Sequence, residues 1–470
     1  MIEIVEERCC GCGGCVCSCP VDALSVRCGV VHADESCIGC GMCVPFCPHG
    51  ALCLPGADKP DFDVDIRPPK GEYDVVVVGG GPAGSIAARI AAEGGASVLL
   101  LEKRPVVGAP QLCGEGISLT GLTDVIPDIR ESWVSAPIIG AVLVSPNGRR
   151  TVVDHPNAGY ILDRRVFDRD LFALAAAAGA RTMTSAGFIA PIWERDHIVG
   201  VRYLNKGKIR EVLCRVIVAA DGVESDTARA LFPKDRIGPD RIHVAAQVVM
   251  SGVDVRIGFP EFHIGRGIAP GGYAWVFPKA EPLVNVGVGI NPSIVVDPPK
   301  TALKLLERFI AGRFGGEGEI IEIASGNVPT SKRLPRIAYR NVLFVGDAGR
   351  LTDPVSGGGL ANALLSGKFA GETVVESLKY KTTEEIEKRL GDYSSRWDRA
   401  KGKQLALYWR AKSIFAKLED EDLEGICRFI DDRFGHDTFN SIDITGTIRS
   451  IIREKRLLFR LVKKLLPGTK

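Results

Sequence analysis

The sequence predicts a chain of three parts: a short cysteine-rich α+β unit, an α/β domain with a parallel sheet and an inserted antiparallel sheet, and a helical C-terminal region. Two dense groups of cysteines before residue 50 indicate the first part. A strand, a glycine-rich loop, a helix and a second strand between residues 73 and 104 indicate the second. Long charged stretches after residue 376 indicate the helical third part.

Length and composition restrict the class of protein. The 470 residues are 46% hydrophobic and 25% charged, with a net charge of +2, so we expect several hydrophobic cores and no nucleic acid as main partner. No apolar run is as long as a membrane span, and the N-terminal "MIEIVEERCC" lacks the apolar core of a secretory signal. We therefore expect a cytoplasmic chain, in which a disulfide framework is not expected.

The cysteines follow one spacing twice. Residues 9–20 read Cys-x2-Cys-x2-Cys-x3-Cys-Pro, and residues 37–48 repeat the pattern. Three thiolates spaced in this way bind one iron–sulfur cubane, while the fourth, before proline, binds the neighbouring cluster. Zinc is the alternative, but zinc sites use paired Cys-x2-Cys units. We predict two [4Fe–4S] clusters, one held by Cys9, Cys12, Cys15 and Cys47 and the other by Cys37, Cys40, Cys43 and Cys19.

This segment resembles the bacterial two-cluster ferredoxins over residues 1–55, which we predict to be a ferredoxin domain. The other cysteines of the segment have no metal-binding spacing, and we interpret them as small residues that pack near the clusters. Residues 56–71 lie in a stretch rich in proline and acidic residues and are predicted to be a linker. The cysteines without a predicted role in metal binding are Cys10, Cys17, Cys28 and Cys53.

A dinucleotide-binding pattern opens the next domain. In "YDVVVVGGGPAGSIAARIAAEGGASVLLLEKR", a buried strand leads into Gly-x-Gly-x-x-Gly, a helix of small residues and a second strand that ends at Glu102. The glycines permit a tight turn and bring the helix N-terminus to a pyrophosphate, and Glu102 is placed to bind ribose hydroxyls. The predicted cofactor contacts are Gly79, Gly81, Ala83, Gly84 and Glu102.

Two later segments decide which dinucleotide is bound. Residues 216–225 form a strand that ends in Asp221-Gly222, and residues 341–372 give a strand, Gly346-Asp347, a glycine-rich turn and a helix that begins near Gly359-Leu360. They resemble the second and third fingerprints of the glutathione-reductase-type flavoproteins. The resemblance implies FAD, with Asp347 at the ribityl chain and the helix N-terminus directed at the flavin. A merely flexible turn at residues 357–359 is the alternative.

The chain has no second complete dinucleotide loop. "NVGVGINPS", residues 285–293, has proline where the third glycine would stand, so we expect a strand there. We therefore predict that electrons reach FAD through the clusters from a reduced external donor of unknown identity, such as a ferredoxin, rather than from NADPH.

Two further motifs point to the substrate. Residues 113–116 read Cys-Gly-Glu-Gly, and Tyr273-x-Trp275-x-Phe277-Pro278 is followed by Gly-x-Gly at residues 287–289. Together they resemble the geranylgeranyl reductase family over about residues 72–380. That family saturates isoprenoid double bonds in archaeal membrane lipids, chlorophyll side chains and quinone tails.

This resemblance implies an oxidoreductase that acts on CH–CH groups, an FAD-dependent prenyl reductase of membrane lipids. It places the aromatic segment beside the flavin as the wall of the lipid cavity and places the cysteine motif near the flavin. The implied substrate contacts are Tyr273, Trp275, Phe277 and Pro278; the implied catalytic residues are Cys113, Tyr273 and Trp275; and the implied flavin contacts include Cys113, Gly114, Gly116, Arg164, Asp221, Gly222, Gly346, Asp347, Gly359 and Leu360.

The residues alone leave plainer interpretations open. Alternating aromatic residues at 273–277 also fit a half-buried strand in a core, Cys113 also fits a small buried thiol, and Arg164 also fits a surface ion pair. The proton source stays open between reduced flavin, Glu115 acting through water, and Tyr273. A quinone oxidoreductase of the electron-transfer-flavoprotein dehydrogenase type is the alternative function, although its single cluster would be expected near the C-terminus.

We predict an FAD domain over residues 72–375, with a substrate-binding sheet inserted at about residues 125–160 and 235–335, and a helical region over residues 376–470. The end, "RSIIREKRLLFRLVKKLLPGTK", has apolar residues at helical spacing with arginine and lysine between them. Such a basic amphipathic helix binds anionic membrane surfaces, so we expect peripheral contact with the inner face of the cell membrane; packing on the protein body is the alternative.

Overall fold

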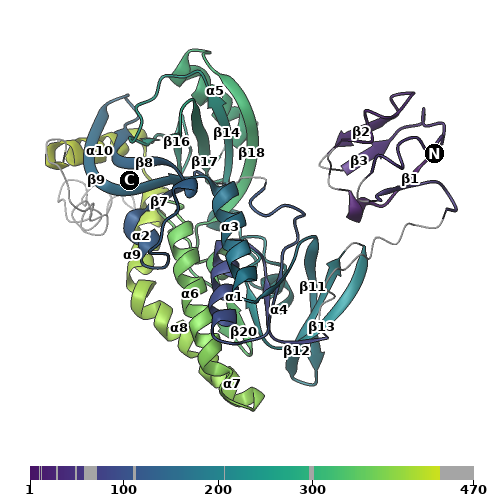
Figure 1. Cartoon of the computed structure of the whole chain (residues 1–470). Coiled ribbons are helices and arrows are strands. Elements are labelled where there is room, and N and C mark those ends of the chain that lie inside the picture. The colour runs from purple at the N-terminus through teal and green to yellow at the C-terminus, as the bar shows by residue number, and fades with distance from the viewer. Residues whose placement is uncertain are drawn as a thin grey trace.

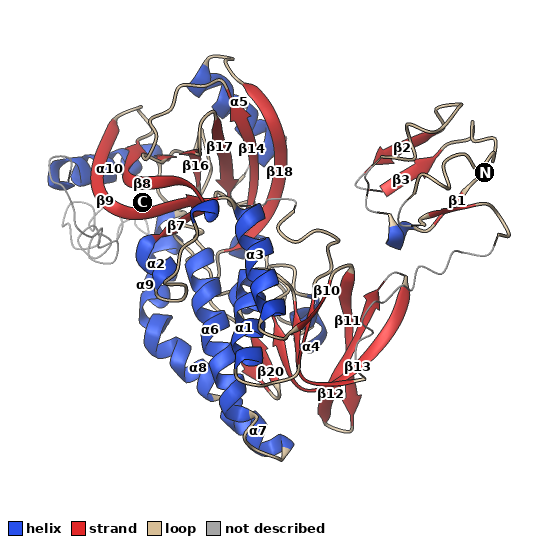
Figure 2. Ribbon diagram, in the orientation of Figure 1, coloured by secondary structure: helices blue, strands red, loops and turns tan. Residues whose placement is uncertain are grey.

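The computed structural model describes residues 1–9, 11, 13–27, 30–47, 50–57, 71–109, 113–205, 207–295 and 301–434 (Figure 1). Within these residues two eight-stranded sheets and a group of helices form the body of the protein, and two small two-stranded sheets form the N-terminal segment (Figure 2). Predicted ligand Cys12 and the basic C-terminal stretch lie outside the described residues.

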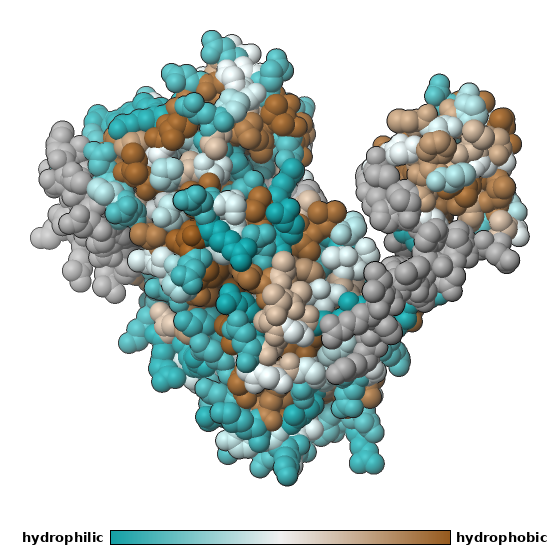
Figure 3. Space-filling model, viewed as in Figure 1, coloured by the Kyte–Doolittle hydropathy of each residue, from teal (hydrophilic) through white to brown (hydrophobic). Residues whose placement is uncertain are grey.

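The N-terminal segment is built around its cysteines. β1 (Glu3–Ile4) pairs antiparallel with β4 (Leu52–Cys53), and β2 (Leu24–Arg27) pairs antiparallel with β3 (Val30–Ala33). A 3-10 helix spans Glu6–Arg8. Many apolar side chains stay on the surface, as the brown areas of this segment in Figure 3 show, because so short a segment has little interior. Its small core contains Ile2, Cys15, Leu24, Val31, Cys43 and Leu52.

The first large sheet joins a parallel part to an antiparallel hairpin through one long strand. β13 (Lys208–Ala219) pairs parallel with β5 (Glu72–Val78) and β20 (Val342–Phe344) along its second half. Its first half pairs antiparallel with β12 (His197–Asn205), which in turn pairs with β11 (Ala186–Glu194). The parallel part continues from β5 to β6 (Val98–Leu101) and β10 (Arg181–Met183), and β19 (Ala338–Tyr339) pairs with β20.

The parallel strands are apolar on both faces because both faces are covered. Val75, Val76 and Val77 of β5 have no exposed surface, as expected for a central parallel strand. α1 (Pro82–Glu93) packs against α3 (Arg164–Ala177) and α6 (Leu360–Ser377), and Figure 1 shows these three helices side by side. The strand–loop–helix–strand pattern predicted from the sequence is thus present, and it orients the glycine-rich loop at the carboxyl end of β5.

The second large sheet has the order β18-β14-β17-β16-β15-β8-β9-β7. Neighbouring strands are antiparallel except β8 and β15, so the sheet is mixed rather than purely antiparallel as the sequence suggested. α5 (Ala302–Phe314) covers one face, where Leu305, Leu306 and Phe309 pack on the strands. The strands are β7 (Gly116–Ser118), β8 (Val134–Val144), β9 (Arg150–Leu162), β14 (Ile242–Ser251), β15 (Glu261–His263), β16 (Tyr273–Pro278), β17 (Leu283–Ile290) and β18 (Glu319–Pro329).

Short helices complete the body. α2 (Leu119–Thr123) and α4 (Asp226–Leu231) follow strands, and 3-10 turns span Glu131–Trp133, Pro239–Arg241 and Gly346–Gly349. Within the described part of the chain, no helix has the length and apolar character needed to cross a membrane. The helices after α6 are α7 (Thr383–Leu390), α8 (Asp392–Trp397), a π-helical segment (Asp398–Gly402), α9 (Lys403–Phe415) and α10 (Asp420–Phe434).

Candidate active site

A cavity of about 340 Å³ lies where the carboxyl ends of the parallel strands meet one face of the second sheet. This is the position at which open α/β sheets bind ligands. Its lining combines segments that are distant in the sequence, and it contains most of the residues predicted to bind a cofactor. From the first sheet and its connections it takes Gly81, Ala83, Glu102, Gly114, Arg164, Gly222, Gly346, Asp347, Gly359 and Leu360, and from the second sheet Tyr273, Trp275, Phe277 and Gly289.

The glycine-rich loop is shaped by close packing at two of its glycines. Gly79 has φ +107°, and a Cβ there would lie 2.3 Å from the carbonyl oxygen of Ala220. A Cβ on Gly84 would lie 1.9 Å from the carbonyl oxygen of Gly79. The space beside Gly81, by contrast, is open within 4 Å. Gly79 and Gly84 therefore let the backbone fold tightly, while Gly81 leaves room for a phosphate at the N-terminus of α1.

Glu102 ends β6 beside this loop. One carboxylate oxygen accepts a hydrogen bond from the amide of Gly80 at 2.8 Å, and the other accepts one from the amide of Arg104 at 2.8 Å. The carboxylate thus fixes the loop and still has lone pairs for a sugar hydroxyl. The loop, its acid and the adjoining space fit a dinucleotide.

Asp347 and the start of α6 line the same cavity. The Asp347 carboxylate accepts a hydrogen bond from the Thr352 hydroxyl at 2.6 Å, and burial raises the pKa of this carboxyl. α6 begins at Leu360 with Gly359 as its N-cap, so the predicted helix start is confirmed. The first amides of a helix have no acceptor within it, so this end favours negative charge in the cavity.

Asp221 was predicted to contact the flavin, but its side chain makes other contacts in the structure. Its carboxylate accepts hydrogen bonds from the Ser225 hydroxyl at 2.6 Å and the Thr227 amide at 2.9 Å. These contacts fix the turn that leads into α4. The neighbouring Gly222, with φ +77°, lines the cavity instead, so we assign Asp221 to shaping this loop.

Arg164 forms an ion pair, which was the alternative to a flavin contact. The pair lies in the cavity wall rather than on the surface. Its guanidinium donates two hydrogen bonds to Asp168 at 2.7 and 2.8 Å, and only 13% of its side chain is exposed. This bidentate geometry holds the guanidinium plane in a fixed orientation.

The aromatic residues of β16 form one wall. Tyr273, Trp275 and Phe277 alternate along the strand, and neighbouring ring centroids lie 6.0 and 6.2 Å apart. The residues between them, Ala274 and Val276, point to the core under α5. Pro278 is buried but is not among the lining residues, in contrast to its prediction as a substrate contact.

The glycines of β17 explain how this wall is packed. A Cβ on Gly287 would lie 2.1 Å from Cζ2 of Trp275, so the indole ring lies directly on this glycine. Gly289 faces the cavity with the Trp275 ring 3.8 Å from its ideal Cβ. The Tyr273 hydroxyl donates a hydrogen bond to the carbonyl of Ser356 at 2.6 Å, and burial raises the pKa of Tyr273.

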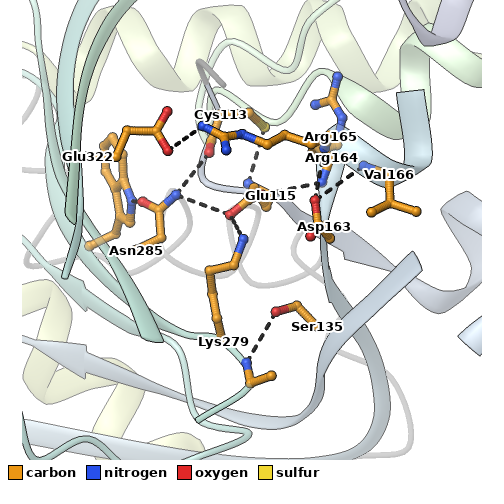
Figure 4. Close-up of polar contacts among 12 residues, drawn as sticks. Cys113, Glu115, Ser135, Asp163, Arg164, Arg165, Val166, Lys279, Asn285 and Glu322 are labelled. Atoms are coloured by element: carbon orange, nitrogen blue, oxygen red, sulfur yellow. Dashed lines mark hydrogen bonds and ion pairs between the residues drawn. The ribbon is translucent and has the colours of Figure 1, made fainter. Parts of the chain in front are cut away.

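A buried polar network joins the cysteine motif to the aromatic wall (Figure 4). The Lys279 ammonium lies 2.5 Å from the Glu115 carboxylate, and 10% and 2% of the two side chains are exposed. The Asn285 amide donates to the Cys113 carbonyl at 3.1 Å and to Glu115 at 3.3 Å, and its oxygen accepts from the Trp275 indole N–H at 2.9 Å. Sequence reasoning assigned no role to Lys279 or Asn285.

Within the cysteine motif, the Cys113 sulfur accepts a hydrogen bond from the Glu115 amide at 3.2 Å. Burial raises the pKa of the Cys113 thiol, which keeps it protonated. Glu115 has φ +70°, unusual for a residue other than glycine. Gly114 lines the cavity, whereas Gly116 lines a second, smaller one.

β14 contributes lining residues that sequence reasoning missed. His243, Ala245 and Gln247 alternate along this strand and face the cavity. The His243 Nε2 atom is buried without a hydrogen-bond partner, and burial, together with the charge of Lys412, lowers the pKa of His243 to about 4. The His-x-Ala-x-Gln alternation was visible in the sequence, but it did not indicate which face lines a cavity.

The cysteine runs of the N-terminal segment adopt matching local structures. The Cys19 sulfur accepts a hydrogen bond from the Ala23 amide at 3.2 Å, and the Cys47 sulfur accepts one from the Ala51 amide at 3.2 Å. One small cavity is lined by the four cysteines that are predicted to bind the second cluster: Cys19, Cys37, Cys40 and Cys43. Among the described residues, which omit Cys12, no three histidine, cysteine or carboxylate side chains are arranged closely enough to hold one metal ion.

Comparison with known proteins decides the family. Residues 241–328 match the model of the geranylgeranyl reductase catalytic domain, residues 74–223 that of FAD-dependent oxidoreductases, and residues 30–53 that of the 4Fe-4S binding domain. A digeranylgeranylglycerophospholipid reductase 1 of Methanococcoides burtonii is 36% identical over 83% of this chain and 95% of its own length. The chain belongs to the geranylgeranyl reductase family.

Other relatives agree with this assignment. A digeranylgeranylglycerophospholipid reductase of Methanothrix thermoacetophila is 37% identical over 81% of this chain and 96% of its own. A geranylgeranyl bacteriochlorophyll reductase-like protein of Thermoplasma acidophilum has a solved structure that matches with a TM-score of 0.77 and 31% identity over 84% of this chain and 99% of that one. The flavin-dependent brominase Bmp2, at 18% identity and a TM-score of 0.60, shares the fold alone. As a family member, the protein is an FAD-dependent oxidoreductase with an iron–sulfur binding segment.

Proposed function

We propose that this protein is an FAD-dependent prenyl reductase that saturates isolated double bonds in the geranylgeranyl chains of a glycerophospholipid. The observation that carries the proposal is the single cavity in which a dinucleotide loop and an aromatic wall face each other. The relatives that match over nearly their whole length bear the name of this reaction. The quinone oxidoreductase alternative has less support, because these relatives do not bear its name and its single cluster would be expected near the C-terminus.

The residues that line the cavity can be assigned to the separate parts of a bound FAD. Gly81, Ala83 and the N-terminus of α1 would hold the pyrophosphate, Glu102 the ribose, and Asp347 the ribityl chain. Arg164, Gly222, Gly346, Gly359 and Leu360 would surround the flavin. FAD in its reduced form would supply a hydride to the alkene.

We further propose two [4Fe–4S] clusters with exchanged fourth cysteines. The matching hydrogen bonds to Cys19 and Cys47 support equivalent roles for these two sulfurs, and the cavity that Cys19 shares with Cys37, Cys40 and Cys43 supports the exchange. Electrons would enter one at a time from a reduced external donor and reach the flavin through the clusters. Contact of the basic C-terminal stretch with a membrane surface stays a prediction.

Saturation of one double bond adds two electrons and two protons, and the chain's own residues bind and orient the alkene. Tyr273, Trp275 and Phe277 would hold the prenyl chain, and their apolar rings would exclude water from the reacting carbons. Burial keeps both the Cys113 thiol and the Tyr273 phenol protonated, so either group retains a proton beside the alkene. Cys113 would then act as a neutral thiol rather than as a nucleophile.

The test is anaerobic reduction of a digeranylgeranylglycerophospholipid by the dithionite-reduced holoenzyme, followed by mass spectrometry. The proposal predicts products that are heavier by two hydrogens for each double bond reduced. An unchanged lipid mass, with the reduced flavin passing its electrons to a quinone, would favour the quinone oxidoreductase instead.

A further inference from the structure

A second cavity adjoins the candidate active site. It has a volume of about 220 Å³ and lies between β7, the loop before α6, and the helices that follow the π-helical segment. Ser356 and Leu360 line both cavities, so the two share a wall. The hydrogen bond from the Tyr273 hydroxyl to the Ser356 carbonyl fixes this wall against the aromatic strand.

The second cavity is polar where the first is aromatic. Lys401, Gln404 and Tyr408 line it from the helical region, and Ser118 and Ser356 line it from the other side. Each serine oxygen accepts a backbone amide, Ser118 from Gly121 at 3.2 Å and Ser356 from Gly358 at 3.1 Å. The Ser356 hydroxyl also makes a hydrogen bond to the Asp353 carboxylate. The Ser118 hydroxyl, whose oxygen accepts a backbone amide, still has its proton to donate to a bound anion.

Lys401 is the cation that lines this cavity. Its charge acts on the Asp353 carboxylate in the same lining, although the ion pairs of 4.0 Å or less among the described residues do not include Lys401. It lies in the π-helical segment Asp398–Gly402. π-Helical turns are rare and occur mostly at functional sites. A lysine in this position, beside the Ser118 hydroxyl, is a suitable contact for a phosphate.

Asp353 is the acidic residue in the same lining. Its carboxylate accepts hydrogen bonds from the amides of Val355 at 2.8 Å and Ser356 at 3.2 Å, so it organises the loop between the two cavities. Burial raises the pKa of this carboxyl, while the hydrogen bonds from Val355 and Ser356 and the charge of Lys401 oppose the rise. Asp353 therefore reduces the positive character of the cavity, but its carboxylate is engaged by the loop amides.

We propose that the second cavity binds the phosphate of the lipid substrate's headgroup, with Lys401 as its cationic contact, while the prenyl chains extend into the aromatic cavity. The inference rests on the proposed function and adds a headgroup subsite to it. Chain and headgroup would then be recognised on opposite sides of the wall formed by Ser356 and Leu360.

The test compares two lipids that differ only in the phosphate: digeranylgeranylglyceryl phosphate and the corresponding diether alcohol. Binding of each lipid to the oxidised holoenzyme is followed by the change in flavin absorbance, which does not depend on turnover. We expect Lys401→Met to weaken binding of the phosphate lipid about tenfold, equivalent to about 1.4 kcal/mol, and to leave binding of the alcohol unchanged. Lys401→Arg should retain most of the preference.

Lys403→Met is the matched control, because Lys403 is exposed at the start of α9 and does not line the cavity. Equal loss of affinity for both lipids in Lys401→Met, or no loss for either, would overturn the headgroup subsite. Inorganic phosphate separates a free-phosphate site from a headgroup site. Phosphate could protect the wild type but not Lys401→Met from thermal unfolding, while Lys401→Met binds both lipids as tightly as the wild type. The cavity would then be a site for free phosphate, and the headgroup subsite would be wrong. Failure of the proposed function would show separately, as bound lipid that is never reduced.

Discussion

At the scale of single residues, the buried pair of Glu115 and Lys279 holds the cysteine motif against the end of the aromatic strand. Glu115 belongs to the cysteine motif, and Lys279 directly follows β16. Asn285 bonds to Glu115 and also to Trp275, so it links this pair to the aromatic wall. Burying two charges is favourable only when both partners are present. Removing one leaves the other charged and desolvated.

Lys279→Met should therefore destabilise the fold by about 3 kcal/mol, because it leaves the Glu115 carboxylate buried without its cation. Lys103→Met is the matched control: Lys103 forms a 3.7 Å ion pair with Glu224 in which half or more of both side chains is exposed, so its loss should cost less than about 1 kcal/mol. Denaturant unfolding followed by flavin release measures both. Equal stability of the two variants would contradict a structural role for the buried pair.

His243 makes the stability of the fold depend on pH. Its pKa is lowered to about 4 by burial, so between about pH 4 and its ordinary value of 6.5 the unfolded state binds more protons than the folded state. Protonation therefore favours unfolding as the pH falls below 6.5, by about 1 kcal/mol at pH 5.5. The melting temperature of His243→Gln should fall less than that of the wild type between pH 7.5 and 5.5. Parallel pH curves for the two proteins would refute this assignment.

At the scale of elements, the aromatic wall depends on which residue of β17 lies opposite each ring. Gly287 supports the Trp275 indole in direct contact, whereas Gly289 faces the cavity. The two glycines of one Gly-x-Gly motif thus have different roles. Gly287 allows the indole ring to pack on the strand, and Gly289 leaves room in the cavity.

Gly287→Ala should cost about 1–3 kcal/mol of stability, because the added methyl group displaces the indole. Gly289→Ala should leave stability nearly unchanged and raise KM for the prenyl lipid, since its methyl group meets the ring at ordinary contact distance and narrows the cavity. Unfolding and steady-state kinetics on both variants provide the measurement. A stable Gly287→Ala with an unaltered KM would show that the indole position is unimportant.

Local patterns predicted the elements better than the contacts between them. The alternation at residues 273–277 and the loop at residues 79–84 are encoded within a few neighbouring residues, and both elements formed where expected. The cofactor contact of Asp221 stays a prediction, because in the structure its carboxylate accepts hydrogen bonds from Ser225 and Thr227 at the start of α4, which its place at the end of a strand did not reveal. Lys279 and Asn285 were missed because their contacts with Glu115 join residues more than 160 positions apart in the chain, and no local spacing reveals such contacts.

At the scale of the whole molecule, the chain combines a cysteine-rich segment with a flavoprotein body. The eight cysteines repeat one spacing, and the hydrogen bonds to the Cys19 and Cys47 sulfurs repeat one geometry, so an iron–sulfur binding segment was predictable from sequence, whereas its two clusters stay a prediction. The mixed strand order of the second sheet was not, because the parallel pairing of β8 with β15 joins strands more than a hundred residues apart. In the function proposed above, electrons would arrive singly and be delivered to the alkene as a pair.

The most direct test of this account is reduction of a digeranylgeranylglycerophospholipid with two electron sources, dithionite and a reduced ferredoxin, by the wild type, Cys40→Ser and Cys17→Ser. Cys17 is exposed and carries no predicted ligand role, so its variant is the control. We expect all three proteins to add pairs of hydrogens with dithionite, and only Cys40→Ser to lose this activity with ferredoxin. Undiminished reduction by Cys40→Ser with ferredoxin would contradict electron entry through the clusters, and an unreduced lipid in every case would contradict the prenyl reductase itself.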